Sequence, residues 1–263
     1  MISLADKYDG FIFDLDGTIY RGSKLIPNAD ETINHLKKLR KKVVFVSNKT
    51  TGNVRDYYLF LKNSGLNIDE SEIVNSSVVI KKYLTKNFPG SKFFAIGEKV
   101  FINELTEAGL KYSDDPKQIG ILIVTLDRTI NYEKLETAAR ALENGAKFFA
   151  ANIDDTCPVD NGEVIDAGST ISALEKRTHK KLELHFGKPS EFMFEEVKSR
   201  LKAELSKVLL IGDRLQTDIA MGNKFGVDTA LVSTGVKFFP NGTDNIVPTY
   251  KLNSVFDLLN HKI

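Results

Sequence analysis

Short apolar runs alternate along this chain with stretches in which apolar side chains recur at every third or fourth position. Residues 11–13 and 43–46 form apolar runs of strand length, and such runs bounded by glycine or polar residues are typical of buried strands. Between them Ile33, Leu36 and Leu39 recur at helical spacing, which predicts an amphipathic helix. A further helix is expected after the second strand, and the order strand, helix, strand, helix predicts a parallel sheet with right-handed crossovers.

The same alternation restarts near residue 76 and resumes a third time near residue 184. The middle section has enough strands and helices for a separate α/β domain of about a hundred residues. The predicted fold class is α/β: a Rossmann-like, doubly wound parallel sheet in a core of residues 1–76 plus 184–263, with an inserted α/β domain of residues 77–183. The strands expected in the later sections are residues 93–97, 119–126, 148–151, 182–186, 208–213 and 229–233, and residues 152–162 are expected to form a polar loop.

Composition and charge narrow the class of protein. The chain has 263 residues, 42% of them hydrophobic, and a net charge of +1, so it has no basic field of the kind that binds nucleic acid. No apolar run approaches the roughly 20 residues that span a bilayer, and residues 1–10 lack the apolar core of a signal peptide. The single cysteine, Cys157, excludes an internal disulfide and indicates a reducing compartment. We therefore expect a cytoplasmic protein with neither nucleic acid nor membrane as a partner.

Two carboxylates directly follow the first predicted strand. Asp14 and Asp16 are separated by one residue, and Gly17 comes next. Asp and Gly dominate tight turns, so a turn alone would explain these residues taken by themselves. Ligands of open α/β sheets, however, bind at the carboxyl ends of the strands, where this pair would emerge. Two like charges about 4 Å apart repel by roughly 4 kcal/mol at an effective dielectric constant of about 20, which indicates a cation or a proton at this position.

Polar groups follow the later strands as well. Each has a structural explanation when taken singly, as a turn residue, a helix cap, a solvated lysine or a charge at a helix N-terminus. Together, carboxylates, a hydroxyl and an amine at strand ends favour phosphoryl transfer, which needs an oxygen nucleophile, a divalent cation and donors for the phosphoryl oxygens. Carboxylates are ligands that Mg²⁺ prefers, and the chain has no zinc-site spacing. The residues are Ser47 and Asn48 after the second strand, Lys188 after residues 182–186, and Asp213 with Asp218 after residues 208–212.

Four motifs in order make the sequence resemble the haloacid dehalogenase superfamily of phosphatases along nearly its whole length. The Gly-Asp-Arg-Leu-x-Thr-Asp form of the fourth motif, with Gly-Lys-Pro in the third, resembles the subgroup of NagD-like and 4-nitrophenylphosphatases. That subgroup carries a large α/β cap, of the C2 type, between its second and third motifs. The matching motifs are residues 14–18 (Asp-Leu-Asp-Gly-Thr), 46–48 (Val-Ser-Asn), 187–190 (Gly-Lys-Pro-Ser) and 212–219 (Gly-Asp-Arg-Leu-Gln-Thr-Asp-Ile).

The resemblance implies a role in catalysis for each matching side chain. Asp14 would attack phosphorus and become an aspartyl-phosphate, and Asp16 would protonate the leaving alcohol and then activate water. Ser47 and the backbone of Asn48 would hold the phosphoryl oxygens. Lys188 would neutralise the nucleophile and the phosphate together.

The same resemblance implies a Mg²⁺ site. Asp213 would bind the ion with the Asp14 carboxylate and the Asp16 carbonyl oxygen, and Asp218 would support it through water.

The cap is expected to contribute to the substrate site. In the resembled subgroup the loop after residue 151 closes over the substrate, so Asn152 and Asp154 would face its leaving group. Relatives also pair through the cap, which leaves a homodimer open for this chain. Lys49 stands where the family's second motif often has a second Asn, so no role carries over to that position.

We expect a Mg²⁺-dependent phosphatase that hydrolyses small phosphate monoesters, of the 4-nitrophenyl phosphate type, through an aspartyl-phosphate. Phosphoglycolate, nucleotides and sugar phosphates occur as substrates among similar enzymes. A phosphotransferase or phosphomutase of the same superfamily differs only in which hydroxyl accepts the group, and it stays an alternative. A receiver-like signalling protein shares the acceptor, the acidic metal site, the hydroxyl and the lysine. It lacks, however, both an Asp two residues after the acceptor and a hundred-residue insertion.

Overall fold

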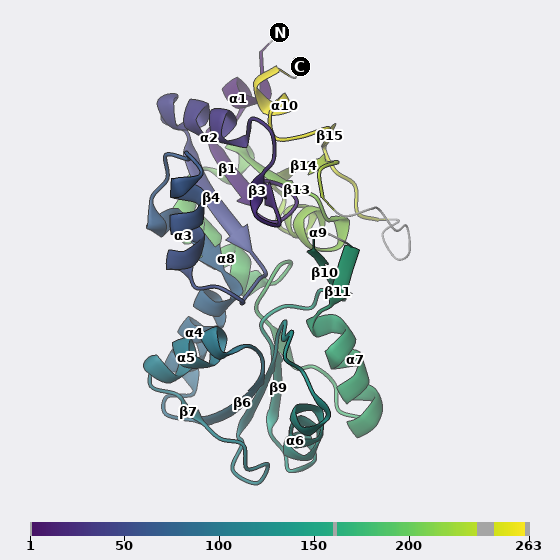
Figure 1. Cartoon of the computed structure of the whole chain (residues 1–263). Coiled ribbons are helices and arrows are strands. Elements are labelled where there is room, and N and C mark those ends of the chain that lie inside the picture. The colour runs from purple at the N-terminus through teal and green to yellow at the C-terminus, as the bar shows by residue number, and fades with distance from the viewer. Residues whose placement is uncertain (1, 160–161, 236–244, 261–263) are drawn as a thin grey trace.

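Two parallel sheets with helices on their faces make up the computed structural model of this chain (Figure 1). The structure describes residues 2–159, 162–235 and 245–260. In the first sheet the chain runs from β1 outward to β5 on one side, and later from β13 outward to β15 on the other. Ligands of such sheets bind where the strand order reverses, which here lies between β1 and β13. The six strands, in spatial order, are β15 (Tyr250–Leu252), β14 (Asp228–Val232), β13 (Val208–Gly212), β1 (Gly10–Asp14), β4 (Lys42–Ser47) and β5 (Ile73–Asn75).

Side chains of the first sheet alternate between two buried clusters, which explains why its strands are continuous apolar runs. Phe11 and Phe13 of β1 pack in one cluster with Phe45 of β4, whereas Ile12 and Val44 pack in the other. Successive side chains of a strand point to opposite faces, and helices cover both faces of a parallel sheet. The first cluster includes α1 (Leu4–Lys7), α2 (Ala29–Lys38), α3 (Val54–Asn63) and α10 (Asp257–Asn260), and the second includes α4 (Ser76–Asn87), α8 (Glu191–Leu201) and α9 (Ala220–Phe225).

A second parallel sheet, of five strands, lies at the opposite end of the molecule from the two termini (Figure 1). One of its faces packs against α6 and α7, and the other against α4 and α5. The cluster on the α4 and α5 side also contains Ile12 and Val44, so one continuous apolar core joins the two sheets. In spatial order the strands are β12 (Leu184–His185), β9 (Lys147–Ala150), β8 (Ile121–Val124), β6 (Lys92–Ile96) and β7 (Lys111–Tyr112), and the helices are α5 (Lys99–Glu107), α6 (Tyr132–Glu143) and α7 (Ala167–Thr178).

Two segments differ from the sequence-based expectation. The strand expected at residues 182–186 is the short β12, and it pairs with β9 of the second sheet, so its assignment to the returning core is wrong. The loop expected at residues 152–162 contains β10 (Thr156–Val159), which pairs with β11 (Gly162–Ile165); residues 160 and 161 lie outside the described part. These strands have no more than four residues and no continuous apolar run, so apolar patterning does not reveal them.

The remaining described elements are short. Strands β2 (Tyr20–Arg21) and β3 (Lys24–Leu25) form a hairpin after β1, and single 3₁₀ turns precede β5 and β13 at Glu70–Glu72 and Leu205–Lys207. Among the described residues, no helix is both long and apolar enough to cross a membrane.

The packing of Phe45 against Phe13 gives a stability prediction for the first sheet. Phe45 is fully buried, and its ring stacks on that of Phe13 with 5.9 Å between centroids. Phe45→Ala should lower the free energy of unfolding by about 3–5 kcal/mol, because it removes a large buried ring and leaves a cavity. Urea denaturation followed by circular dichroism measures this. Leu59→Ala, at a side chain that is 41% exposed, is the control and should cost less than about 1 kcal/mol; equal costs would contradict the prediction.

Candidate active site

Strand β1 places two carboxylates where the strand order of the first sheet reverses. Asp14 is its last residue and is buried. Gly17 then turns the chain with a φ of +94°, a left-handed conformation that glycine adopts at little cost. A Cβ at Gly17 would lie 2.6 Å from Asp213 Oδ2. Glycine is therefore required both for the turn and for the close approach of Asp213.

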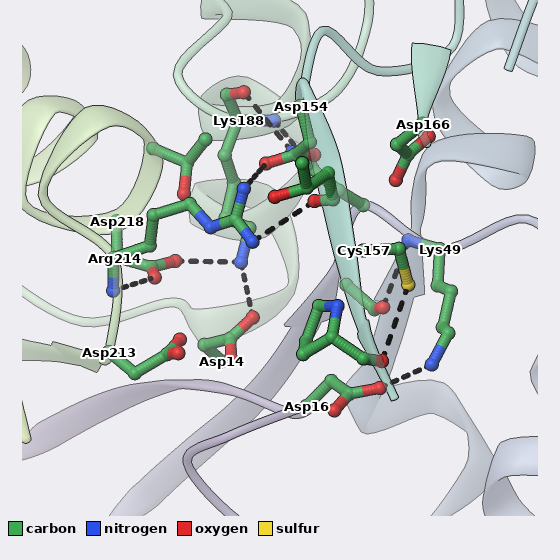
Figure 2. A pocket seen from close by; sticks show the side chains of 15 residues that line it. Asp14, Asp16, Lys49, Asp154, Cys157, Asp166, Lys188, Asp213, Arg214 and Asp218 are labelled. Atoms are coloured by element: carbon green, nitrogen blue, oxygen red, sulfur yellow. Dashed lines mark hydrogen bonds and ion pairs between the residues drawn. The ribbon is translucent and has the colours of Figure 1, made fainter. Parts of the chain in front are cut away.

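Lys188 joins two of the predicted carboxylates. Its ammonium pairs with Asp14 Oδ1 and, at 2.7 Å, with Asp218 Oδ1, and its side chain is 4% exposed (Figure 2). Burial opposes the charged ammonium, but the two carboxylates raise the pKa of Lys188 above its ordinary value. Burial raises the pKa of Asp14, although Lys188 opposes this shift. Burial likewise raises the pKa of Asp218 to about 6. Residues 174 positions apart in the sequence thus meet in one buried ion cluster.

The segment after β13 carries Asp218 and brings one further carboxylate, that of Asp213, to the same place. Leu215–Ile219 forms a π-helical turn before α9, and Asp218 Oδ2 accepts the backbone N–H of Arg214 at 3.2 Å. Asp14, Asp213 and Asp218 each offer a carboxylate oxygen, all within 4.8 Å of one another. Asp14 Oδ2 is buried without a hydrogen-bond partner among the described residues, which is costly for a carboxylate. These residues fit a divalent cation with hard oxygen ligands.

Asp16 has a different cation as its partner. Its Oδ2 pairs with the ammonium of Lys49, whereas its Oδ1 is buried without a hydrogen-bond partner in the part of the chain that the structure describes. Burial opposes the charge on Lys49, but Asp16 beside it raises the pKa of Lys49. Figure 2 shows this pair next to the pair of Asp14 and Lys188. One carboxylate therefore lies in the buried cluster, and the other lies beside a partly exposed lysine.

The end of β4 contributes a hydroxyl and a carboxamide. Ser47 is buried, and its Oγ accepts the backbone N–H of Lys49 at 3.1 Å. Asn48 Oδ1 accepts the backbone N–H of Lys188 at 2.7 Å, and its Nδ2 donates to Asp154 Oδ2 at 2.8 Å. The side chain of Asn48 thus connects β4 to the loop that carries Lys188 and to the loop after β9.

Asp154 connects the loop after β9 to residues at the strand ends of the first sheet through hydrogen bonds. Its Oδ1 accepts a hydrogen bond of 3.2 Å from Arg214 Nη1, and its Oδ2 accepts hydrogen bonds from the carboxamide groups of Asn48 and Asn152. Arg214 Nη2 donates in addition to the carbonyl oxygen of Thr156 at 3.1 Å. Asp154 lines the pocket, but protein donors already occupy both of its oxygens. Arg214 lies within the fourth motif, yet its pairing with Asp154 was missed by sequence reasoning.

Asn152 lies inside the inserted segment and not on the pocket. It is 1% exposed, its Nδ2 donates to Asp166 Oδ1 at 3.0 Å, and its Oδ1 accepts Thr125 Oγ1 at 3.1 Å. Thr125 also shares a hydrogen bond of 2.5 Å with Thr50, which follows β4. The resemblance implied that Asn152 faces the leaving group. Its carboxamide instead forms hydrogen bonds that stabilise the loop that carries Asp154.

A small pocket lies between the strand ends and this loop (Figure 2). Its volume is about 60 Å³, and its wall contains six carboxylates but only three cations. The pocket is therefore strongly acidic, although phosphate esters are anions. The lining residues are Asp14, Asp16, Ser47, Asn48, Lys49, Asp154, Thr156, Cys157, Pro158, Asp166, Lys188, Asp213, Arg214, Thr217 and Asp218.

Comparison with known proteins gives the family of the chain. A family model described as haloacid dehalogenase-like hydrolase matches residues 11–111, and a HAD-hydrolase-like model matches residues 185–258. The sugar-phosphatase AraL of Bacillus subtilis (strain 168) is 36% identical over 252 residues, which cover 95% of this chain and 91% of that protein. The chain belongs to the haloacid dehalogenase-like hydrolases. The two matching ranges contain all four motifs of the site.

Other relatives are also phosphatases. Phosphoglycolate phosphatase 1A of Arabidopsis thaliana is 34% identical over 285 residues, covering 98% of this chain and 78% of that protein. The solved p-nitrophenyl phosphatase from Archaeoglobus fulgidus has a TM-score of 0.87 and 32% identity, covering 97% of this chain and 100% of that one. A glycerol phosphate phosphatase from Mycobacterium tuberculosis, solved in complex with magnesium, has a TM-score of 0.85 and 27% identity, covering 98% and 78%. The predicted phosphatase class, NagD-like subgroup and α/β fold are confirmed.

The ion pair between Asp154 and Arg214 should be measurable as a coupling energy. Both side chains are largely buried, so Asp154→Ala and Arg214→Ala should each destabilise the protein by leaving the other charge unpaired. We expect a coupling of at least about 1 kcal/mol in a double-mutant cycle, since contacting residues are not additive. Urea denaturation of the wild type, both single variants and the double variant measures it. Additive costs would show that the two groups do not interact.

Cys157 should react slowly with alkylating agents in the folded protein. Burial raises the pKa of its thiol to about 11, so at pH 8 only about one thiol in a thousand is the reactive thiolate. Iodoacetamide labelling followed by mass spectrometry should be much faster in urea than in buffer, and the rate in buffer should rise with pH up to about 11. Because the chain has one cysteine, the readout is unambiguous. Equal rates in urea and buffer would contradict the prediction.

Proposed function

We propose that this chain hydrolyses small phosphate monoesters with the help of Mg²⁺, through a phosphorylated Asp14. The observation that carries the proposal is the state of the Asp14 carboxylate: Lys188 binds one of its oxygens, and the other is buried without a hydrogen-bond partner among the described residues. The carboxylate is thus oriented by the protein and still able to act as a ligand and a nucleophile.

The reaction proceeds in two steps. First, an oxygen of Asp14 bonds to phosphorus while the bond from phosphorus to the ester oxygen breaks, and Asp16 gives that ester oxygen a proton. Second, Asp16 takes a proton from water, the water oxygen bonds to phosphorus, and the bond from phosphorus to Asp14 breaks. The Oδ1 of Asp16, buried without a hydrogen-bond partner in the described ranges, is available for both proton transfers.

Donors around the nucleophile would hold the phosphoryl oxygens. The ammonium of Lys188, the hydroxyl of Ser47 and the backbone N–H of Asn48 are the proposed groups. Lys188 and Ser47 are almost fully buried, and fixed donors in a site that excludes water stabilise developing charge strongly. The carboxamide of Asn48 accepts the backbone N–H of Lys188 and so restrains that loop.

The acidity of the pocket supports the proposal of a metal ion. Six carboxylates against three cations would repel a phosphate ester. Asp14 and Asp213, with the Asp16 carbonyl oxygen, are the proposed Mg²⁺ ligands, and Asp218 is proposed to support them. When bound, Mg²⁺ neutralises phosphoryl charge and orients the ester. The magnesium complex of the mycobacterial relative is consistent with this choice.

The proposal extends to the organisation of the protein. We assign residues 1–76 plus 186–263 to a core and residues 77–185 to a cap; the boundary expected at residue 184 moves past β12, because β12 pairs with β9 of the second sheet. A cap over a pocket of about 60 Å³ favours small esters over phosphoproteins. A cytoplasmic location and a homodimer paired through the cap stay predictions.

Substitution of Asp14 tests the proposed function. Asp14→Asn should lower the hydrolysis of 4-nitrophenyl phosphate by at least about a thousandfold, because a carboxamide does not form the acyl-phosphate. EDTA should abolish wild-type turnover, and added Mg²⁺ should restore it. Release of 4-nitrophenol measures both effects.

Asp16→Asn is the matched variant for this experiment. It should slow turnover by roughly 10²–10⁴-fold through the loss of proton transfer, while the nucleophile that forms the phosphoenzyme stays in place. Circular dichroism should show that both variants are folded. Normal turnover by folded Asp14→Asn would exclude Asp14 as the nucleophile.

A further inference from the structure

Lys49 lines the pocket, but the phosphoryl transfer proposed above does not use it. It follows Asn48 at the end of β4, its side chain is 23% exposed, and its ammonium pairs with Asp16 Oδ2 (Figure 2). Partial burial of an ammonium costs free energy unless a counter-charge lies close to it. Asp16 supplies this counter-charge while it is ionised. When Asp16 holds the proton that it gives to the ester oxygen it is neutral, and Lys49 can then bind a negative charge of the substrate.

The other two cations of the described pocket wall are held by partners other than the proposed proton donor. Lys188 is held by two carboxylates at the nucleophile, and Arg214 is held by the cap loop. Lys49 differs because its ion-pair partner is Asp16, the proposed proton donor. A general acid has to lie within hydrogen-bond reach of the ester oxygen. The substituents on that oxygen consequently extend into the part of the pocket next to Lys49.

The cap segment that lines the pocket offers few groups that could bind a charge on the leaving group. Residues 156–158 (Thr-Cys-Pro) belong to the lining, and a thiol and a proline ring are poor hydrogen-bonding groups. The two cap carboxylates, Asp154 and Asp166, already accept hydrogen bonds from protein donors. Within the described lining, Lys49 is thus the side chain best placed to bind a charge on the leaving group.

The volume of the pocket favours short esters. One water needs about 10–15 Å³ on this measure, so about 60 Å³ has room for roughly five waters. Since each water occupies about 30 Å³ of liquid, this space corresponds to a phosphate ester with a leaving group of only a few carbon atoms.

We propose that Lys49 determines specificity at this site, and that it selects phosphate monoesters of short hydroxy acids, in which a carboxylate of the leaving group binds its ammonium. The inference rests on the proposed function, because it assumes hydrolysis in this pocket. A neutral ester of the same length would lose that ion pair, and a cationic ester would be repelled.

Three esters of equal length test the proposal with the full chain and Mg²⁺. They are 2-phosphoglycolate, 2-hydroxyethyl phosphate and O-phosphoethanolamine, whose leaving groups end in a carboxylate, a hydroxyl and an ammonium. The wild type should show kcat/KM values that fall in this order. The readout is the ratio of kcat/KM for 2-phosphoglycolate to that for 2-hydroxyethyl phosphate. This ratio cancels any effect of Lys49 on Asp16, since both esters need the same proton donor.

Substitutions of Lys49 should change that ratio. Lys49→Met and Lys49→Asn should lower it at least tenfold, mainly through KM for 2-phosphoglycolate, and Lys49→Arg should keep it within about threefold of the wild type. Lys49→Glu should reverse the order, so that O-phosphoethanolamine becomes better than 2-phosphoglycolate. Lys62→Met, at an exposed lysine of α3, is the matched control and should leave the ratio as it is. Melting curves identify any variant that does not fold.

The outcomes separate the possible roles of Lys49. If the Lys49 variants lose kcat/KM equally with both esters, Lys49 only positions Asp16 and the proposal is overturned. A wild type that does not prefer 2-phosphoglycolate would also overturn it. Failure to hydrolyse these esters or 4-nitrophenyl phosphate would instead reject the proposed function itself. If folded Lys49→Met keeps the wild-type ratio of the two kcat/KM values, Lys49 does not determine specificity, even if the wild type prefers 2-phosphoglycolate.

Discussion

The site depends on one buried cation, Lys188, held between Asp14 and Asp218. Strands β1 and β13 are parallel neighbours with Phe13 opposite Ile211. Asp14 at the end of β1 and Asp213 directly after β13 therefore emerge at the same level of the sheet. Removal of one partner from a buried ion pair costs about 3–5 kcal/mol, whereas an apolar replacement of the whole pair is often neutral or stabilising. Stability alone therefore does not explain why these charges are buried together. The proposed transfer of a phosphoryl group, which needs these charges close together, accounts for their arrangement.

The second sheet is tied to this cluster by polar contacts as well as by the shared apolar core. Asn48 bonds at once to the backbone of Lys188 and to Asp154, and Asp154 also binds Arg214. A shift of the loop after β9 would therefore also displace the loop that carries Lys188. The position of the loop after β9 and the orientation of the charged groups are consequently coupled, because the same side chains hold both.

Much of the fold and the core of the site could be predicted because both follow from local pattern. Apolar runs in β1, β4 and β13 mark strands buried on both faces, and the polar residues after them meet because the strands are parallel and adjacent. The hairpin of β10 and β11, the pairing of β12 with β9 and the inward orientation of Asn152 depend on contacts between segments far apart in sequence. No residue type at these positions specifies its partner. Lys49 differed visibly from the family motif, but its pairing with Asp16 required the structure.

Two aspartates separated by a single residue acquire different chemistry here through the cations beside them. Asp14 lies in a buried cluster where Lys188 binds one of its oxygens, which suits the proposed nucleophile. Asp16 pairs with a lysine that is partly open to solvent, which suits a group that exchanges protons with an alcohol and with water. Because the rest of the pocket wall is acidic, a second negative charge on the substrate would be repelled nearly everywhere else in it. The cation beside the proposed proton donor is therefore also the position at which we propose that leaving groups are distinguished.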